Sequence, residues 1–581
     1  MAYLSSVGVR VTETDLTPII QPTSSSIGAY VGHFNWGPCD NPTNVTSETS
    51  LGNIFGFPQK SADLTAKSFL TAASFLKYGD TLKVIRCVGD DAKNAVGAII
   101  SPYNPEEEVV SEFLFKNESV FETTDLDDNA QEVFCARYPG VRGNSLLVKV
   151  FHIDNTDKTQ IQNTTNIADC KGLFTYLPDT TDWGTTNNFI ADEIHVVVID
   201  QEGEITGTKD SVLERWEGLS LNPEAKLVNG ATNYYADVLN RSSAYVYVTN
   251  GSALYPTPEV VNGITTYSVG SPTIVPQYNF AGGLNGTVLP ANVVDSLQIF
   301  NDIENIDLNL LFAEGFAEDT GRSVNQALAQ VAVDRRDCIA FLSAPLDLYK
   351  ENSDDAKLEA LLDAKDNFIN LSSYIVFDST PVYTYNRYAD KYEWIPACGH
   401  MAGLCAYTDE VADAWFSPAG LNRGQLRGVT KLAYNPKQAD RDELYNNNIN
   451  SIMTFPGQGT VLWGDKTGQS RATAFDRINV RRLFNVIQKE VKKAARYQLF
   501  ELNDDFTRAT FKNSIEPFLR DVQGRRGITE FKVVCDETNN TADVIDANQF
   551  VADIYIKPAR SINFITLNFV ATRTSLSFTE L

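Results

Sequence analysis

The chain ends with the stretch SINFITLNFVATRTSLSFTEL, residues 561–581. Apolar side chains recur at every second position from Ile565 to Ala571, which is the period of a β-strand with one buried face. A terminal strand with nothing after it to pair with offers open backbone donors and acceptors, and natural proteins usually protect such an edge. The pattern predicts a C-terminal strand whose partner has to be found elsewhere.

The first residues have the same pattern. In SSVGVRVTETD, residues 5–15, the apolar Val7, Val9 and Val11 alternate with glycine and polar residues, and a tether-like TPIIQPTSSS follows. Both ends therefore resemble short strands joined to the rest of the chain by flexible linkers. Two interpretations are open, because the termini can pair with each other inside one domain or with neighbouring molecules.

Length and composition limit the alternatives. A chain of 581 residues is too long for one core and predicts about three or four domains. A net charge of -26 argues against a general nucleic-acid binder and favours solubility. The chain begins with MAYLSSVGVR, which does not resemble a signal peptide, and it has no run of about 20 apolar residues. We expect synthesis and folding in cytoplasm, with no membrane insertion.

The order of patterns along the chain predicts a multidomain α+β protein. Strand, helix and strand patterns over 26–90 resume over 285–460 and indicate one discontinuous α/β middle domain. Residues 91–284 are acidic, rich in Thr and Asn, and contain strand signals such as EIHVVVID, so they predict a β-rich outer insertion. We expect residues 1–25 to be an N-terminal arm and 461–581 to be an α+β C-terminal domain with its own strand arm.

The C-terminal region contains the sharpest charge contrast. Residues 471–500 hold eight Lys or Arg residues against two acidic ones, in a strongly acidic chain. Their apolar residues fit one face of a long helix. A second face is basic and, although it could be an ordinary solvated surface, we expect it to meet an acidic partner surface; it carries Arg481, Lys489, Lys492 and Arg496.

The sequence contains few candidate residues for catalysis or metal binding. There are four histidines, and His33, His152 and His195 lie in strand-like patterns where a structural role is expected. Cys398, His400 and Cys405 in CGHMAGLC lack the paired spacing of a structural zinc site, and burial in a helix of small residues explains them better. GQGTVLWGDKT at 457–467 departs from phosphate-loop patterns and predicts a hairpin turn. We identify no catalytic, cofactor-binding or metal-binding residue.

Several longer stretches resemble the tail sheath protein of contractile-tailed bacteriophages, and the T-even type most closely. Residues 90–132 depart from that pattern, because they are much shorter than the outer domain expected there. The stretches that carry the resemblance are FNWGP (34–38), YPGVRGNSLLVKV (138–150), GLCAYTDE (403–410), SPAGLNRG (417–424), LWGDKT (462–467), FDRINVRRLF (475–484) and KPARSINFITLNFVAT (557–572).

The resemblance implies a mechanical protein of the virion tail, assembled in the host cytoplasm, with no cofactor. Sheath subunits of that family form hexameric rings stacked around a tail tube, between a baseplate and a tail terminator, and contract from an extended metastable state. It also implies that both arms complete sheets in neighbouring copies. The inter-subunit strands would then include Val7, Val9, Val11, Ile562, Phe564, Ile565, Leu567 and Phe569.

In that family the C-terminal domain lines the inside of the sheath, so the resemblance implies that the basic helix faces the tube. A related contractile injection device remains an alternative to a virion tail. A cytoplasmic enzyme with an unrecognised site, a tail-tube or capsid protein, and a nucleic-acid binder that uses the basic helix also remain open.

Overall fold

A computed structural model of the chain describes residues 25–58, 64–99, 112–124, 133–153, 170–249, 258–267, 276–313, 322–349, 353–369, 371–563 and 566. The expected inter-subunit strand positions Val7, Val9, Val11, Phe564, Ile565, Leu567 and Phe569 lie outside these residues. Ile562 lies inside them, in no strand, with 82% of its side chain exposed.

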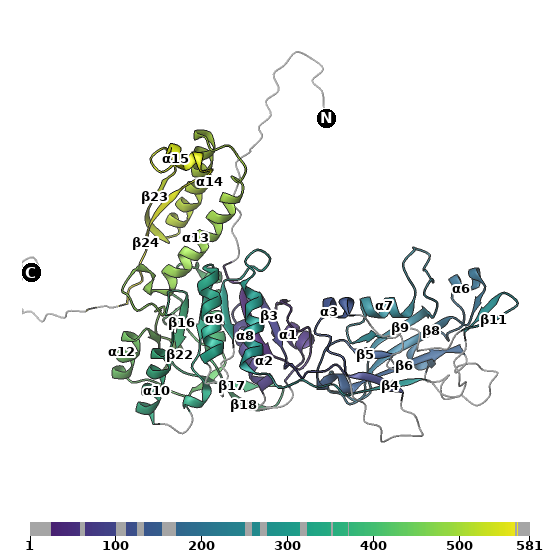
Figure 1. The fold of residues 1–581 in the computed structure, drawn as a ribbon. Coiled ribbons are helices and arrows are strands. Elements are labelled where there is room, and N and C mark those ends of the chain that lie inside the picture. The colour runs from purple at the N-terminus through teal and green to yellow at the C-terminus, as the bar shows by residue number, and fades with distance from the viewer. Residues whose placement is uncertain are drawn as a thin grey trace, which may run out of the picture.

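A seven-stranded sheet forms the centre of the molecule (Figure 1). Six of its strands run parallel, and the edge strand β2 pairs antiparallel with β3. The strands come from two separate parts of the chain, because β1 pairs with β14 across more than 270 residues of sequence. In sheet order the strands are β2 (Thr43–Val45), β3 (Leu82–Cys87), β1 (Gly28–His33), β14 (Leu310–Ala313), β15 (Ile339–Leu342), β16 (Ile375–Asp378) and β20 (Ile449–Asn450).

Helices cover both faces of this sheet, which explains why its strands are almost continuously apolar. On one face, α2 and α11 pack together on residues such as Phe312; on the other, α8 and α9 cover residues such as Leu311. The helices of this part are α1 (Glu48–Phe55), α2 (Leu64–Leu76), α8 (Pro290–Gln298), α9 (Arg322–Arg335), α10 (Asp354–Asp366), α11 (Cys398–Val411) and α12 (Gln438–Asn446).

Two smaller antiparallel sheets complete this part of the molecule. One orders its strands β18-β17-β19, and the other is a hairpin of β21 and β22 that turns at Gly457 and Gly459, as the sequence predicts. Both glycines have positive φ, which L side chains rarely adopt. The bounds are β17 (Val382–Asn386), β18 (Lys391–Ile395), β19 (Val429–Leu432), β21 (Ile452–Phe455) and β22 (Gly459–Leu462).

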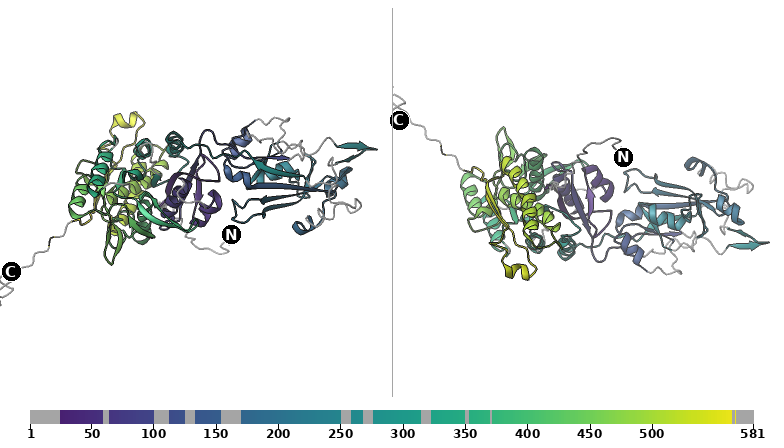
Figure 2. Two further views of the ribbon diagram at one scale, coloured as in Figure 1. Left: turned by 90° about the horizontal axis from the view of Figure 1, so that it is seen from below. Right: turned by 90° about the horizontal axis from the view of Figure 1, so that it is seen from above.

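A second seven-stranded sheet, antiparallel throughout, projects sideways from the central one (Figures 1 and 2). In sheet order its strands are β10 (Val246–Val248), β5 (Phe134–Ala136), β4 (Val96–Ile99), β13 (Gln277–Ala281), β6 (Leu146–His152), β8 (Glu193–Asp200) and β9 (Ser211–Ser220). Around it lie α3 (Glu118–Thr123), α6 (Asp182–Asn187), α7 (Tyr235–Ser242) and a small sheet of β11 (Glu259–Val261), β12 (Ile264–Thr266) and β7 (Phe189–Ile190).

A fully buried arginine joins these two sheets. Arg86 on β3 donates through Nε to the carbonyl of Phe34 at 2.9 Å and through Nη2 to the carbonyl of Pro139 at 2.7 Å. Burial lowers the pKa of Arg86, and the carbonyl oxygens replace the water that the guanidinium has lost. The projecting part is therefore fixed to the centre by directional bonds.

The C-terminal part stands on the central body, on the long helix α13 (Figure 1). α13 (Ile478–Arg496) packs against α14 (Asp505–Gly524), and α14 covers a two-stranded sheet of β23 (Ile528–Val534) and β24 (Asp553–Pro558). A short α15 (Ala542–Asp546) connects the two strands. Together these parts make a mixed α/β multidomain fold.

Candidate functional site

The start of α13 carries two arginines that bind aspartates from other parts of the chain. Arg477, the residue that precedes the first turn, places Nη1 2.9 Å from Asp465 Oδ1. Arg482, in the second turn, places Nη2 2.6 Å from Asp409 Oδ2. Both ion pairs are contacts within the chain.

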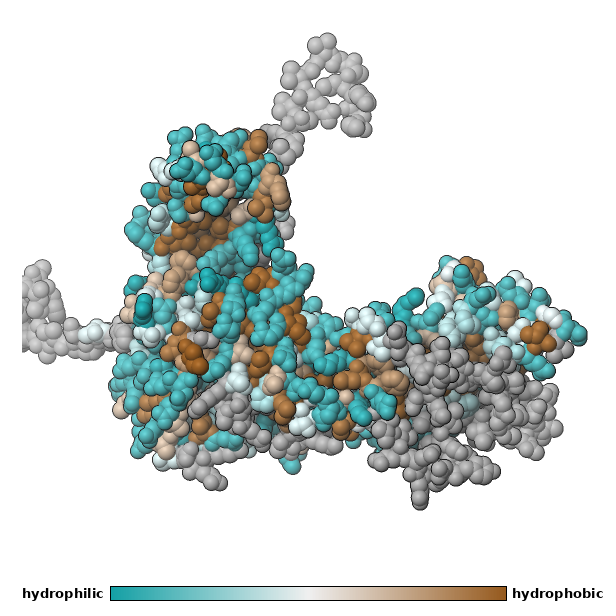
Figure 3. Space-filling model, viewed as in Figure 1, coloured by the Kyte–Doolittle hydropathy of each residue, from teal (hydrophilic) through white to brown (hydrophobic). Residues whose placement is uncertain are grey.

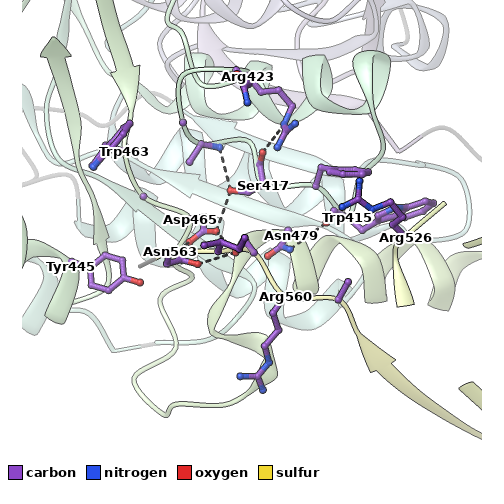
Figure 4. Close-up of a pocket in the computed structure, with 18 of the residues that line it drawn as sticks. Trp415, Ser417, Arg423, Tyr445, Trp463, Asp465, Asn479, Arg526, Arg560 and Asn563 are labelled. Carbon is purple, nitrogen blue, oxygen red and sulfur yellow. Dashed lines mark hydrogen bonds between the residues drawn. The ribbon is translucent and has the colours of Figure 1, made fainter. Parts of the chain in front are cut away.

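Asp465 holds the segment that precedes the predicted C-terminal arm (Figure 4). Ser561 Oγ donates to its Oδ2 at 2.9 Å, and Asn563 Nδ2 donates to its Oδ1 at 2.9 Å. Ser417 Oγ adds a third hydrogen bond of 3.1 Å from the body. The carboxylate is almost fully buried, and Arg477 balances its charge, so this cluster fixes residues 561–563 to the base of α13.

Asp409, at the end of α11, holds the segment that follows the predicted N-terminal arm. Ser25 Oγ donates to Asp409 Oδ2 at 2.7 Å, and Arg482 Nη2 donates to the carbonyl of Ser25 at 3.3 Å. Burial raises the pKa of Asp409 above its usual range, and the neighbouring Arg482 partly offsets this rise. The pair is buried on both sides, so breaking it would leave an uncompensated charge inside the protein.

The two clusters therefore bring both ends of the described chain to one helix. Ser25 and Ser561 are far apart in sequence, yet each donates a hydrogen bond to an aspartate. These aspartates pair with Arg482 and Arg477, which lie five positions apart at the start of α13. We call the Asp465 cluster the C-anchor and the Asp409 cluster the N-anchor.

The strand β24 ends at Pro558, just before Ser561 of the C-anchor, and its sheet with β23 is partly exposed. Within the described residues the two strands pair only with each other, antiparallel. α14 covers one side through Leu519 and Val522, while Tyr555 on β24 is 61% exposed. A sheet of two strands has two open edges that can accept further strands.

The prediction that Arg481 belongs to a basic face of α13 that meets a partner is wrong. Arg481 is buried, with its guanidinium 4.4 Å from the ring centre of Tyr374 and 4.6 Å from that of Phe475. Helical spacing gives the direction of Arg481 on the helix. Because the first turns of α13 are packed against the body, a side chain in that direction contacts protein. Burial lowers the pKa of Arg481, and the two aromatic faces give its charge a favourable surface.

The other three basic residues divide into two groups. Lys489 Nζ contacts Asp307 Oδ1 and the carbonyl of Leu308, both at 2.6 Å, and so ties the middle of α13 to the body. Lys492 and Arg496 are exposed and line a hollow of about 690 Å³ beside residues 301–304. Only the last turns of α13 therefore present basic side chains to the outside.

The histidine and cysteine candidates are part of the packed interior. His400 on α11 is fully buried, its Nδ1 lies 3.1 Å from Tyr78 Oη, and burial lowers its pKa well below the usual range. Cys398 and Cys405 lie buried on the same helix, as the small-residue pattern predicts. Among the described residues no group of three or more His, Cys, Asp or Glu side chains is arranged to hold a metal ion. No helix in the described ranges is long and apolar enough to cross a bilayer.

Sequence reasoning missed the aspartates that form the anchors. A signal was present, because Asp409, Asp465, Arg477 and Ser561 all lie within the stretches that resemble tail sheath proteins. Resemblance could mark these residues but could not pair them, since Ser561 lies 96 residues from Asp465 and Ser25 lies 384 residues from Asp409.

Comparisons with known proteins agree with this architecture. Family sequence models match three parts of the chain: the tail sheath protein Gp18 domain III N-terminal region at 25–87, the phage tail sheath protein central domain at 291–468, and the phage tail sheath C-terminal domain at 470–572. The two anchors join residues of all three matched parts.

Whole-length relatives give the same result. The chain is 32% identical to the tail sheath protein of Vibrio phage KVP40 over 100% of its length and 99% of the relative's. It is 31% identical to that of Enterobacteria phage T4, with 100% and 99% covered. Its fold is similar to the sheath tail protein Lin1278 from Listeria innocua, with a TM-score of 0.52, 11% identity, and 93% and 96% of the two chains covered. The chain therefore belongs to the tail sheath protein family of contractile-tailed bacteriophages.

Proposed function

We propose that this sheath protein polymerises as hexameric rings stacked helically around a rigid tail tube. The sheath would be assembled in the host cytoplasm in an extended, metastable state, between a baseplate and a tail terminator. Its contraction would drive the tube through the host envelope. The role is structural and mechanical.

The observation that carries this proposal is the anchoring of both chain ends beside an incomplete sheet. A sheet of two strands with open edges suits strand addition, in which main-chain hydrogen bonds supply the affinity. The segments that follow Asn563 and precede Ser25 carry the strand-like patterns of residues 565–571 and 7–11. We infer that these strands complete the β23–β24 sheets of neighbouring copies.

The same inference assigns the parts of the chain. Residues 1–25 form the N-terminal arm, 26–90 and 285–460 the middle domain, 91–284 the outer insertion, and 461–581 the inner domain with its strand arm. The exposed end of α13, with Lys492 and Arg496, is the side we place toward the tube. Charge contacts at an interface rim are weak enough to release during movement.

Electron microscopy of the purified full-length chain tests the proposal. We expect long tubules of uniform diameter from the wild type, whereas dispersed particles under every assembly condition would contradict it. Deletion of residues 1–20, or of 562–581, should leave a soluble monomer that unfolds cooperatively and forms no tubules. Aggregation or a large loss of stability on deletion would instead mean that the termini pair within one subunit.

A finer test changes one backbone donor at a time. Val9→Pro and Leu567→Pro each remove a strand hydrogen bond and restrict the local dihedral, so they should block assembly while the melting temperature of the subunit barely moves. Val9→Ala and Leu567→Ala are the matched controls, because they keep the backbone donor. Normal assembly of both proline variants would show that these strands are not the links.

A further inference from the structure

The turn between α13 and α14 exposes a group of large apolar side chains. We call residues 497–506 the α13–α14 tip. Large exposed apolar groups on a soluble protein mark sites of interaction, and Figure 3 shows brown apolar surface on the part of the molecule that contains α13 and α14. The exposed side chains are Tyr497 (71%), Leu499 (63%), Phe500 (105%), Leu502 (78%) and Phe506 (79%).

The tip is an ordered turn. Backbone hydrogen bonds join Leu499 N to the carbonyl of Arg496 at 3.3 Å and Asp504 N to that of Leu502 at 3.0 Å. Phe500 has a φ of 70°, in the left-handed region that bulky residues rarely adopt. The turn thus holds a phenyl ring fully in solvent in an unfavourable backbone conformation, which a partner surface would explain.

Carboxylates surround the apolar side chains of the tip. Asp504 accepts the hydrogen bond of Thr507 N at 2.8 Å and caps α14, and Asp505 pairs with Arg508. Glu501 is exposed and forms no ion pair with any residue that the structure describes. A surface suited to this tip would be aromatic and positively charged.

Such a surface exists at the other end of α13. A groove of about 1300 Å³ lies between the body and the C-terminal part, and it is larger than an ordinary small-molecule pocket of ~300–1000 Å³. Trp415, Tyr445 and Trp463 line it (Figure 4), and Trp463 is 43% exposed. We call it the arginine groove, after Arg423, Arg441, Arg526 and Arg560 in its lining.

The four arginines have no carboxylate partner among the residues that the structure describes. Arg423 Nε donates to the carbonyl of Ser417 at 3.0 Å, and Arg441 Nη1 to that of Pro436 at 3.3 Å. Across the described part of the chain, none of the four forms an ion pair within 4.0 Å. Asp442 and Asp465 also line the groove, but Arg477 pairs with Asp465, so the four arginines leave the lining positively charged and able to attract an acidic segment.

We propose that the α13–α14 tip of one copy docks in the arginine groove of the next copy. Asn479 at the start of α13 lines the groove, whereas the tip begins at Tyr497. At 1.5 Å per residue the helix separates the two by about 27 Å, so they cannot meet within one subunit. A contact between two different patches is heterologous and generates rings or helical filaments.

This contact rests on the proposed sheath assembly, and its groove shares Ser417, Asp465, Ser561 and Asn563 with the C-anchor. Apolar rings of the tip would enter the aromatic lining, and Glu501 would reach the arginines. The contact adds a second link between neighbouring copies, made by their folded parts, beside the links that the arms supply.

A disulfide cross-link tests the contact directly. All eight native cysteines are buried, so cysteines placed on the surface react selectively. Phe500→Cys protein mixed with Asn422→Cys protein should form covalent dimers on mild oxidation under assembly conditions, because Asn422 lines the groove. Val228→Cys replaces Phe500→Cys in the control, since Val228 is 101% exposed but lies on the projecting part, and it should give at least tenfold less dimer. Equal yields would overturn the proposal.

Charge exchange gives a second, independent test. Glu501→Lys or Arg526→Glu alone should slow tubule growth at least tenfold at unchanged melting temperature, and the double variant should recover most of the rate. If neither single variant changes the rate of tubule growth, while the arm deletions abolish it, the docking contact is refuted. The sheath function is then unaffected. A wild type that never forms tubules would refute the sheath function instead, and the cross-link alone would then decide the contact.

Discussion

Ser561 donates a hydrogen bond of 2.9 Å to Asp465, and this buried carboxylate is also the ion-pair partner of Arg477 at the base of α13. Arg482, in the second turn of α13, pairs with Asp409 on α11, and Asp409 accepts a hydrogen bond from Ser25. The helix α13 therefore connects the two ends of the described chain. In a sheath linked by its arms, a force applied to either arm would be transmitted to the subunit through the start of α13. The following predictions test this connection and the surfaces around it.

The N-anchor should be a large stabilising element. Asp409→Asn leaves the buried Arg482 without a counter-charge, and breaking one side of such a pair costs about 3–5 kcal/mol of the free energy of unfolding. Urea unfolding measures the loss. Glu530→Gln is the control, because Glu530 pairs with Lys557 at an exposed site and its change should barely alter stability. Equal effects from the two variants would show that the buried pair is not special.

The C-anchor should affect assembly more than folding. Ser561→Ala with Asn563→Ala removes two hydrogen bonds to Asp465 and should lower the free energy of unfolding by about 2 kcal/mol at most. The rate of tubule formation should fall more clearly, since the C-terminal segment loses its fixed starting direction. Thr186→Ala, which removes an exposed hydroxyl bonded within its own helix, should change neither quantity. An unchanged rate in the double variant would contradict the anchor role.

Asp378 should give stability a distinctive pH dependence. Burial at the end of β16 raises its pKa from 3.8 to about 7, although Ser343 donates a hydrogen bond to it. The folded state therefore holds this proton more tightly than the unfolded state. The stabilising contribution is complete below pH 3.8 and is lost as the pH rises to 7, with little further change above.

The difference between wild type and Asp378→Asn isolates this effect. Between pH 5 and pH 7 the wild type should lose about 2 kcal/mol more of its free energy of unfolding than the variant, at 1.36 kcal/mol per pH unit. Asp366→Asn changes an aspartate that is 68% exposed and should leave the pH profile as in wild type. Parallel profiles for wild type and Asp378→Asn would rule out the raised pKa.

The exposed end of α13 should contribute to binding of the tail tube. Lys492→Glu with Arg496→Glu should weaken the affinity of subunits for purified tubes about tenfold at low salt, and added salt should reduce the difference. Lys209→Glu with Arg215→Glu is the matched control, because it makes the same charge change on the projecting sheet. Tube affinity that neither salt nor the α13 variant changes would remove this helix end from the interface.

Local patterns in the sequence were sufficient for many of the elements. The strand signal in EIHVVVID predicted β8, and the spacing of apolar residues over 471–500 predicted a helix, observed as α13 over 478–496. Gly457 and Gly459 predicted a hairpin turn. These signals succeed because helix and strand periods, and the conformational freedom of glycine, depend on residues close together in the chain.

Tertiary structure decided what the charged residues do. Arg481 and Lys492 share a basic pattern on one helix, yet Arg481 is buried between two aromatic rings and Lys492 is exposed, because the contacts of α13 with the body end near Lys489. Asp465 and Asp409 lie in stretches that resemble tail sheath proteins, but local patterns did not reveal which residues they hold, since Ser561 and Ser25 lie about 100 and almost 400 residues away. Periodicity fixes the angle of a side chain on its helix, but its surroundings depend on which distant segments pack there.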